Sequence, residues 1–165
     1  MYMVAWMLGS GIGKVQLYVP SAPDGLKRKR GGGNVATKKP QTRIEKKKAN
    51  KAFSDYIRNR DGWRCYTCGR SVDKYTADAG HLFSRYWAAT LYDEDNTHCQ
   101  CKKCNILHEV DSEPYKQKFI AEYGEDFYWE LYRKSKELTK RTVYDYIDLR
   151  KEFEGKLETI RGSND

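Results

Sequence analysis

Two Cys-x2-Cys pairs, Cys65/Cys68 and Cys101/Cys104, constrain the fold of this chain more than any other feature of its sequence. Each pair can present two thiolates from one tight turn, and two such pairs complete a tetrahedral zinc site. Cysteines with this spacing indicate metal ligation in a reducing compartment rather than a disulfide framework. A metal would also reinforce the small core of a 165-residue chain in which 33% of the residues are charged. The fifth cysteine, Cys99, is expected to be a small buried side chain.

Positive charge is concentrated near the N-terminus. The net charge is +8, and eleven of the 31 Lys and Arg lie between Lys27 and Lys51, where Glu45 is the single acidic residue. A stretch of this kind can neutralise phosphates, which predicts contact with nucleic acid. A solvated linker that needs its charge only for solubility is the alternative. The residues expected to contact nucleic acid in this stretch are Lys27, Arg28, Lys29, Arg30, Lys46, Lys47 and Lys48.

Residues 1–43 are expected to form a flexible basic arm. They include Pro20, Pro23 and a run of three glycines, Gly31 to Gly33, with few apolar side chains after residue 20. The first thirteen residues are uncharged but too short to span a bilayer, and no basic residue precedes them as in a signal peptide. We therefore expect no membrane partner.

Apolar residues recur at helical spacing in five segments, and these predict helices. The expected helices are 45–61, 102–110, 111–124, one that contains 127–132, and 142–160. Residues 64–91 read as short strands and turns, in which Gly69 is free to adopt a positive φ after the first cysteine pair. The expected class is α+β, with an arm (1–43), a zinc-binding core (44–110) and a helical C-terminal extension (111–165).

The two cysteine pairs frame His81 and Asn105. A first pair on a hairpin turn and a second pair at a helix start describe a treble-clef zinc site. On that scaffold His81 would lie on the hairpin and Asn105 in the first turn of the helix. The spacing therefore predicts that the two side chains face one another across a small cleft.

Here the chain resembles a family. The pattern Cys-x2-Cys-Gly, Ala-Gly-His81 and Asn96-x3-Gln-Cys-x2-Cys-Asn105 is similar to that of the HNH (ββα-metal) endonucleases. Closer still, Asp-Ala-Gly-His81-x3-Arg85 with Gln100-Cys-Lys-Lys-Cys-Asn105 resembles the phage NinG/Rap recombination proteins, over roughly residues 50–157. The phage recombination endonuclease VII shares the four-cysteine site followed by asparagine.

The resemblance implies a role for each framed residue. His81 matches the general base that takes a proton from water. Asn105 matches a ligand of a catalytic divalent cation, Mg²⁺ or Mn²⁺, and Asn96 matches the residue that orients the base and pins its loop. Many HNH enzymes carry an aspartate directly before the base, where this chain has Gly80. Asp78 is then the substitute ligand.

That substitution raises a geometric question. In a regular strand, residues 78 and 81 point to opposite faces, so we expect a bend at Ala79–Gly80. His108 and Glu109 are alternative ligands, since they share the helix face of Asn105. Arg85 is a candidate phosphate contact.

Each of these residues also has a structural interpretation. His81 can be a hydrogen-bonded structural histidine, Asn105 a helix cap and Asn96 a turn residue. His98 is expected to be structural. Four aromatic residues are expected in the core rather than as base-stacking platforms: Tyr75, Phe83, Tyr86 and Trp87.

The sequence therefore predicts a phage-type DNA endonuclease, with structural Zn²⁺ and catalytic Mg²⁺ or Mn²⁺, located in the host cytoplasm. The resemblance implies branched DNA as substrate, and a homodimer would supply two active sites. A zinc-finger module that binds nucleic acid without cutting it is the alternative. A protein-interaction module built on the zinc site is the third hypothesis.

Overall fold

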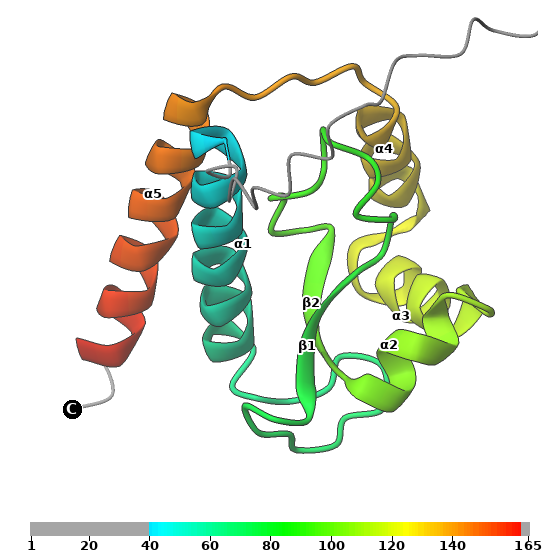
Figure 1. Ribbon diagram of the computed structural model, residues 1–165. Coiled ribbons are helices and arrows are strands. Elements are labelled where there is room, and N and C mark those ends of the chain that lie inside the picture. The colour runs from blue at the N-terminus through cyan, green and yellow to red at the C-terminus, as the bar shows by residue number, and fades with distance from the viewer. Residues whose placement is uncertain (1–39, 163–165) are drawn as a thin grey trace, which may run out of the picture. The chain divides into compact units, whose positions relative to one another are not determined.

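The computed structural model describes residues 40–162, and in that range the chain forms five helices and one two-stranded sheet (Figure 1). The predicted mixture of helices with a small sheet is confirmed. The arm residues 1–39, with the predicted nucleic-acid contacts Lys27, Arg28, Lys29 and Arg30, lie outside the described residues. The elements are α1 (Gln41–Arg60), β1 (Ala77–His81), β2 (Thr97–Cys101), α2 (Lys102–His108), α3 (Glu113–Tyr123), α4 (Glu125–Ser135) and α5 (Val143–Gly162).

Helix α1 begins at Gln41, directly after Pro40, which is four residues before the predicted start. Glu45 is buried rather than terminal, because its carboxylate accepts hydrogen bonds from Gln41 (3.1 Å) and Lys48 (2.8 Å) and lies 3.8 Å from Arg150 of α5. The local sequence pattern does not predict that Glu45 has a partner on α5. The helix ends at Arg60, as its sequence predicts.

The sheet is a regular antiparallel pair. Its register runs from Ala77 opposite Cys101 to His81 opposite Thr97, with one residue facing one residue throughout. The bend predicted at Ala79–Gly80 is therefore absent, and this expectation was wrong. All five residues of β2 are buried, which shows that both faces of this strand are covered.

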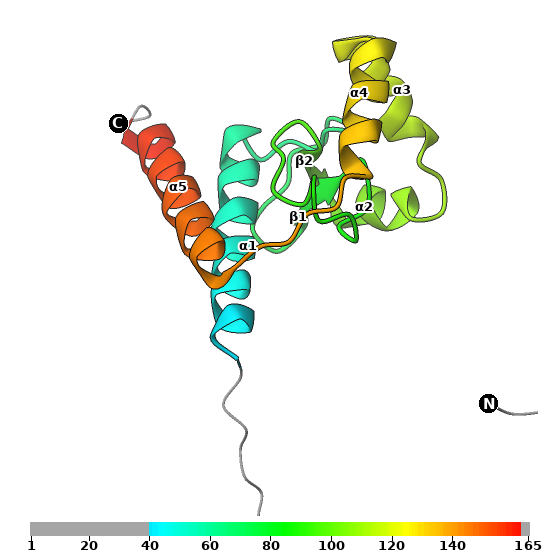
Figure 2. The ribbon, with the colours of Figure 1, turned by 90° about the horizontal axis from the view of Figure 1, so that it is seen from above.

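One side of the sheet is covered by α1, which packs along α5 (Figures 1 and 2). The C-terminal helix thus returns to the N-terminal helix. Phe153 of α5 lies 4.7 Å from Phe53 and 5.5 Å from Tyr56 between ring centroids. The buried cluster on this side consists of Ala49, Ala52, Phe53, Tyr56, Ile57, Leu91, Tyr92, Tyr146 and Phe153.

A second cluster lies under α3 and α4, on the far side of the sheet from α5 in Figure 2. Its buried members are Leu82, Tyr115, Phe119 and Leu131. The hydroxyl of Tyr115 donates to Gly80 O (3.3 Å), so α3 is tied to β1 itself. The sheet is therefore held between two separate apolar clusters.

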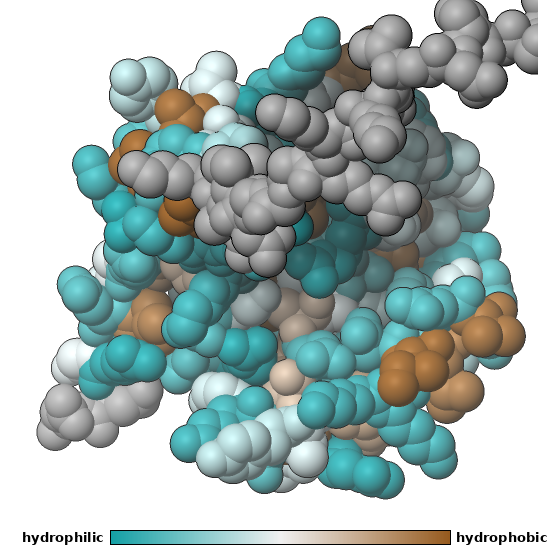
Figure 3. Space-filling view, viewed as in Figure 1, coloured by the Kyte–Doolittle hydropathy of each residue, from teal (hydrophilic) through white to brown (hydrophobic). Residues whose placement is uncertain are grey.

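The face shown in Figure 3 is mostly hydrophilic, and an apolar group of Ile106, Leu107 and Val110 lies over and just beyond α2. Two of the four aromatics expected in the core are exposed: Tyr75 to 70% and Tyr86 to 86%. That expectation was wrong for them because both belong to loops, where a side chain need not face a core. Within the described range, every helix is too short or too polar to cross a membrane.

We expect Phe153→Ala to destabilise the fold by about 3–5 kcal/mol, because it leaves a cavity between α1 and α5. Chemical denaturation with circular dichroism would measure the loss. Tyr144→Ala is the control, since Tyr144 is exposed on the same helix and should change the free energy of unfolding by less than about 0.5 kcal/mol. Equal effects of both substitutions would contradict the packing.

Candidate active site

The first cysteine pair sits on a tight hairpin turn. Cys65 N donates to Arg70 O and Gly69 N donates to Cys65 O, both at 2.8 Å. Gly69 has a φ of 70°, as its sequence context predicts. The turn therefore points the thiols of Cys65 and Cys68 the same way.

The second pair lies where β2 ends and α2 begins. Cys101 is the last residue of β2 and the N-cap of α2, where its sulfur accepts a hydrogen bond from Cys104 N (3.4 Å). Asn105 follows Cys104 directly and lies within the helix. The interpretation of Asn105 as the helix cap is therefore wrong, because Cys101 occupies that position.

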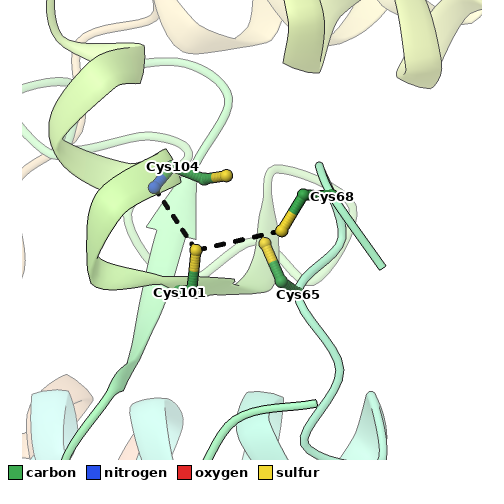
Figure 4. Close-up of side chains that lie close together, drawn as sticks. All are labelled: Cys65, Cys68, Cys101 and Cys104. Carbon is green, nitrogen blue, oxygen red and sulfur yellow. Dashed lines mark hydrogen bonds between the residues drawn. The ribbon is translucent and has the colours of Figure 1, made fainter. Parts of the chain in front are cut away.

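The four sulfurs converge, as Figure 4 shows. All lie within 4.8 Å of one another, and the Sγ atoms of Cys68 and Cys101 are 4.0 Å apart. A tetrahedral site with zinc–sulfur bonds of about 2.3 Å has sulfur–sulfur distances of about 3.8 Å, so the group can hold a zinc ion. Cys99 is fully buried, as expected, and is not part of the group.

The acidities of the thiols differ with their surroundings. Burial raises the pKa of Cys65 and of Cys104. The backbone amide of Arg70 lowers the pKa of the exposed Cys68 to about 7. A cation that stabilises thiolates would offset the cost of ionising the buried members.

A cleft of about 640 Å³ lies between α1, β1 and α2. Within residues 40–162, β1 pairs only with β2. Residues from both faces of β1 (Asp78, Ala79 and His81) line the cleft, so it lies along the edge away from β2. The lining residues are Ser54, Arg58, Asp78, Ala79, His81, Leu82, Ser84, Arg85, Asn105, His108 and Glu109. His81 and Asn105 thus share one cleft, as their spacing predicts.

A hydrogen bond to Leu91 holds the imidazole of His81. Its Nε2 lies 3.0 Å from Leu91 O, and because a carbonyl can only accept, Nε2 carries the proton. Nδ1 is then the nitrogen with the lone pair, and it is buried without a hydrogen-bond partner. Burial lowers the pKa of His81 to about 4, with a further lowering by Arg85, so the side chain is neutral at pH 7.

Gly80 is explained by its neighbour on β2. A Cβ at this position would lie 1.9 Å from Oε1 of Gln100, whose amide donates to Thr67 Oγ1 (2.6 Å). The fully buried Gln100 thus leaves no room for an aspartate directly before the histidine. Asp78 lies two residues earlier and therefore on the same strand face as Gly80. No bend is needed, because a cleft along a strand edge is bordered by both faces.

Asp78 and Asn105 meet in this cleft. Asn105 Nδ2 donates to Asp78 Oδ2 at 3.3 Å. With its amide turned over, Asn105 would present Oδ1 beside the carboxylate, and two such oxygens suit a hard divalent cation. Glu109 and His108 also line the cleft, and His108 Nε2 donates to Leu82 O (3.1 Å).

Asn96 lies outside the cleft lining and is fully buried. Its Oδ1 accepts from Phe83 N (2.8 Å), and its Nδ2 donates to Phe83 O (3.1 Å) and Thr90 O (3.0 Å). These bonds pin the loop between the strands, which was part of the predicted role. Asn96 makes no hydrogen bond to His81, so it can act on the base only through that loop.

The residues predicted to contact nucleic acid within the described range differ in their exposure and in whether they pair with an acidic side chain. Lys46 and Lys47 are exposed on α1, whereas Lys48 is paired with Glu45. Arg85 is exposed and lines the cleft. Arg58 also lines the cleft but pairs with Asp55. The sequence interpretation missed that α1 forms a wall here; the four-residue spacing of Ser54 and Arg58 was the available signal.

His98 is structural, as expected. It is buried, its Nδ1 lies 2.8 Å from the Tyr115 hydroxyl, and its ring stacks on Tyr66 at 4.0 Å. Burial lowers its pKa to about 4. It therefore links β2 with α3 and with the loop of the first cysteine pair.

These features define a small protein of mixed helix and sheet with a four-cysteine centre that can bind metal. Residues 27–162 match the family model described as Bacteriophage Lambda NinG protein, and the chain belongs to this family. The membership indicates a role related to phage recombination. Neither the curated proteins nor the solved structures gave a match.

We expect Cys65→Ala to abolish stoichiometric zinc binding and to lower the melting temperature sharply, because one of four ligands is lost. Metal content by elemental analysis and thermal denaturation would measure both effects. Cys99→Ala is the matched control: it removes a buried thiol outside the cluster and should keep its zinc. Retention of full zinc by Cys65→Ala would contradict the ligand assignment.

The pKa of His81 also predicts a pH dependence. The pKa is about 4 in the folded state and about 6.5 in an unfolded chain, so the unfolded chain binds more protons between these values. Stability contributed by this residue is present above pH 6.5 and lost as the pH falls to 4, by about 3 kcal/mol. Unfolding free energies of the wild type and His81→Gln at several pH values would measure it. A pH-independent difference between the two proteins would contradict the burial of a neutral imidazole.

Proposed function

We propose that the protein is a metal-dependent DNA endonuclease of the HNH type, acting on DNA in phage recombination. One observation carries the proposal: His81, whose buried Nδ1 has no hydrogen-bond partner, lines the same cleft as the side-chain pair of Asp78 and Asn105. The first is a base and the second is a site for a hard cation. Family membership over residues 27–162 supports the biological setting.

The cysteine centre serves as a frame in this proposal. Four thiolates fill a tetrahedral shell and leave no position for water, so zinc bound there would be structural. It would join the first hairpin turn to the junction of β2 and α2, in the manner of a treble clef. Since Cys104 and Asn105 are adjacent, the centre also fixes the start of the helix that carries Asn105.

In this proposal, side chains of the protein accept the proton of the attacking water and bind the charged oxygens of the phosphate. The oxygen of a water molecule attacks phosphorus, its proton passes to His81 Nδ1, and the bond to the leaving oxygen breaks. Leu91 O holds Nε2–H and so leaves Nδ1 as the nitrogen that can accept a proton. Arg85, which lines the cleft, would bind a phosphate oxygen. A divalent cation held by Asp78 and Asn105 would stabilise charge on the phosphate and on the leaving oxygen.

The depressed pKa of His81 fits this role in a specific way. At about 4 it ensures that the free protein has an unprotonated base at pH 7. The negative charge of a bound phosphodiester favours the imidazolium, which raises the pKa toward the range where proton transfer is efficient. Binding of the substrate would therefore strengthen the base.

We expect His81→Gln to lower the rate of DNA cleavage at least about 100-fold, because general base catalysis is lost. Glutamine can keep the Nε2 donation to Leu91 O while lacking the basic nitrogen. Cleavage of labelled duplex and branched DNA, with Mg²⁺ added or omitted, would measure the rate. Omission is preferable to EDTA, which would also remove zinc.

Two controls make this test decisive. Zinc content and helicity of His81→Gln must equal those of the wild type. Asp78→Asn should raise the Mg²⁺ concentration needed for half-maximal cleavage, whereas Asp126→Asn, at an exposed acid on α4, should not. Equal cleavage by the wild type and His81→Gln would contradict the role of His81 as the base. Tight binding with no cleavage by either protein would favour a zinc module that only binds DNA.

A further inference from the structure

Tyr86 is an exposed aromatic side chain beside the cleft. The residue is 86% exposed, and Ser84 and Arg85, its immediate predecessors, both line the cleft. The wall of the cleft and the exposed ring therefore belong to one short stretch of the loop between β1 and β2. Residues 82–92 carry a single charge, that of Arg85.

The backbone that presents Tyr86 is fixed. Its amide donates to Ser84 Oγ (3.2 Å), and Trp87 N donates to Ser84 O (2.9 Å). Phe83, at the start of this turn, is bonded through both its amide and its carbonyl to the buried Asn96. The turn that carries Tyr86 is thus ordered by its own hydrogen bonds, so little backbone entropy is lost when a ligand binds the ring.

The ring of Tyr86 also has a rigid neighbour. It meets Trp87 edge-to-face, with centroids 5.9 Å apart and planes at 84°. The half-buried Trp87 lies in turn 3.6 Å from Lys136 Nζ. The high exposure of Tyr86 shows that its ring is largely uncovered. Tyr75, which is also exposed, differs from Tyr86 because a cation, Lys74 Nζ, lies 4.9 Å from the centre of its ring.

The surroundings of the loop suit a polyanion. Arg85 is exposed, Lys136 lies over Trp87, and Arg141 Nη1 donates to Ala88 O. Three cations therefore border the stretch that displays the ring. Aromatic rings beside cations bind single-stranded nucleic acid, because bases stack on the rings and phosphates pair with the cations.

We propose that Tyr86 stacks on an unpaired DNA base next to the phosphate held at Arg85, and so selects substrates with unpaired nucleotides. This inference rests on the proposed endonuclease function. In a continuous duplex each base is covered on both faces by its neighbours, so it offers no face to the ring. At a gap, flap or branch point a base is uncovered and can stack on Tyr86.

The test compares the affinity for paired and for gapped DNA of the same sequence. The full-length, zinc-loaded protein is used without Mg²⁺, so that DNA is bound without being cut. Fluorescence anisotropy gives the Kd, and 2-aminopurine placed in the gap reports stacking through loss of its fluorescence. The variants are Tyr86→Ala, Tyr86→Phe and, as a matched control, Tyr144→Ala, which removes an exposed tyrosine of α5.

The expected result is about a tenfold rise in the Kd of Tyr86→Ala for gapped DNA, with little change for the duplex. Tyr86→Phe and Tyr144→Ala should bind like the wild type, and the 2-aminopurine signal should be quenched by all except Tyr86→Ala. An unchanged ratio of the two Kd values in Tyr86→Ala would overturn the proposal. An equal loss for both DNAs would also overturn it, since the side chain would then contact only backbone.

The outcomes separate this inference from the proposed function. Cleavage that depends on His81, combined with unchanged selectivity in Tyr86→Ala, would overturn the stacking role and leave the endonuclease intact. A wild-type protein that binds no DNA would overturn both.

Discussion

The convergence of four thiols where β2 passes into α2 is the constraint on which the rest of the cleft depends. It fixes the end of a strand, the start of a helix and a distant hairpin turn relative to one another. β1 is then positioned by its pairing with β2, and Asn105 by its place directly after Cys104. The polar residues that line the cleft are therefore attached to a rigid frame without being part of it. In the proposed function, this separation would let a metal centre with no open coordination position support a reactive site beside it.

The cleft retains polar groups that a purely structural packing would not favour. His81 is only 8% exposed, yet its Nδ1 has no hydrogen-bond partner. A buried acceptor left unpaired costs about 1–3 kcal/mol, and such costs concentrate at functional sites. The same loop exposes the ring of Tyr86 and places Arg85 between that ring and the cleft. The loop thus contributes both to the cleft and to an adjacent surface, and Asn96 fixes it from inside.

Much of the fold could be predicted from local patterns. Helical spacing identified the five helices of residues 40–162, and Gly69 marked a turn because its conformation is set locally. The grouping of four cysteines that can hold a metal followed from their spacing, and the burial of Cys99 followed from the usual burial of a free cysteine. The expectations that were wrong concerned features that tertiary contacts determine. α1 begins before its predicted start, and its Glu45 is paired with Arg150 of α5. Tyr86 is exposed because it belongs to a loop that turns outward.

The sequence by itself determined the metal-binding group, the helices and the residues that could carry chemistry, since spacing and side-chain type express these directly. Tertiary structure alone decided how those residues combine. Strand alternation places Asp78 and His81 on opposite faces, so a bend was expected to bring them together. They line one cleft without a bend, because residues from both faces of β1 border it. The sequence does not explain why position 80 lacks an aspartate, whereas the structure shows that Gln100 fills the space that a side chain there would need. Both facts depend on which surfaces meet in three dimensions, and a linear pattern does not contain that information.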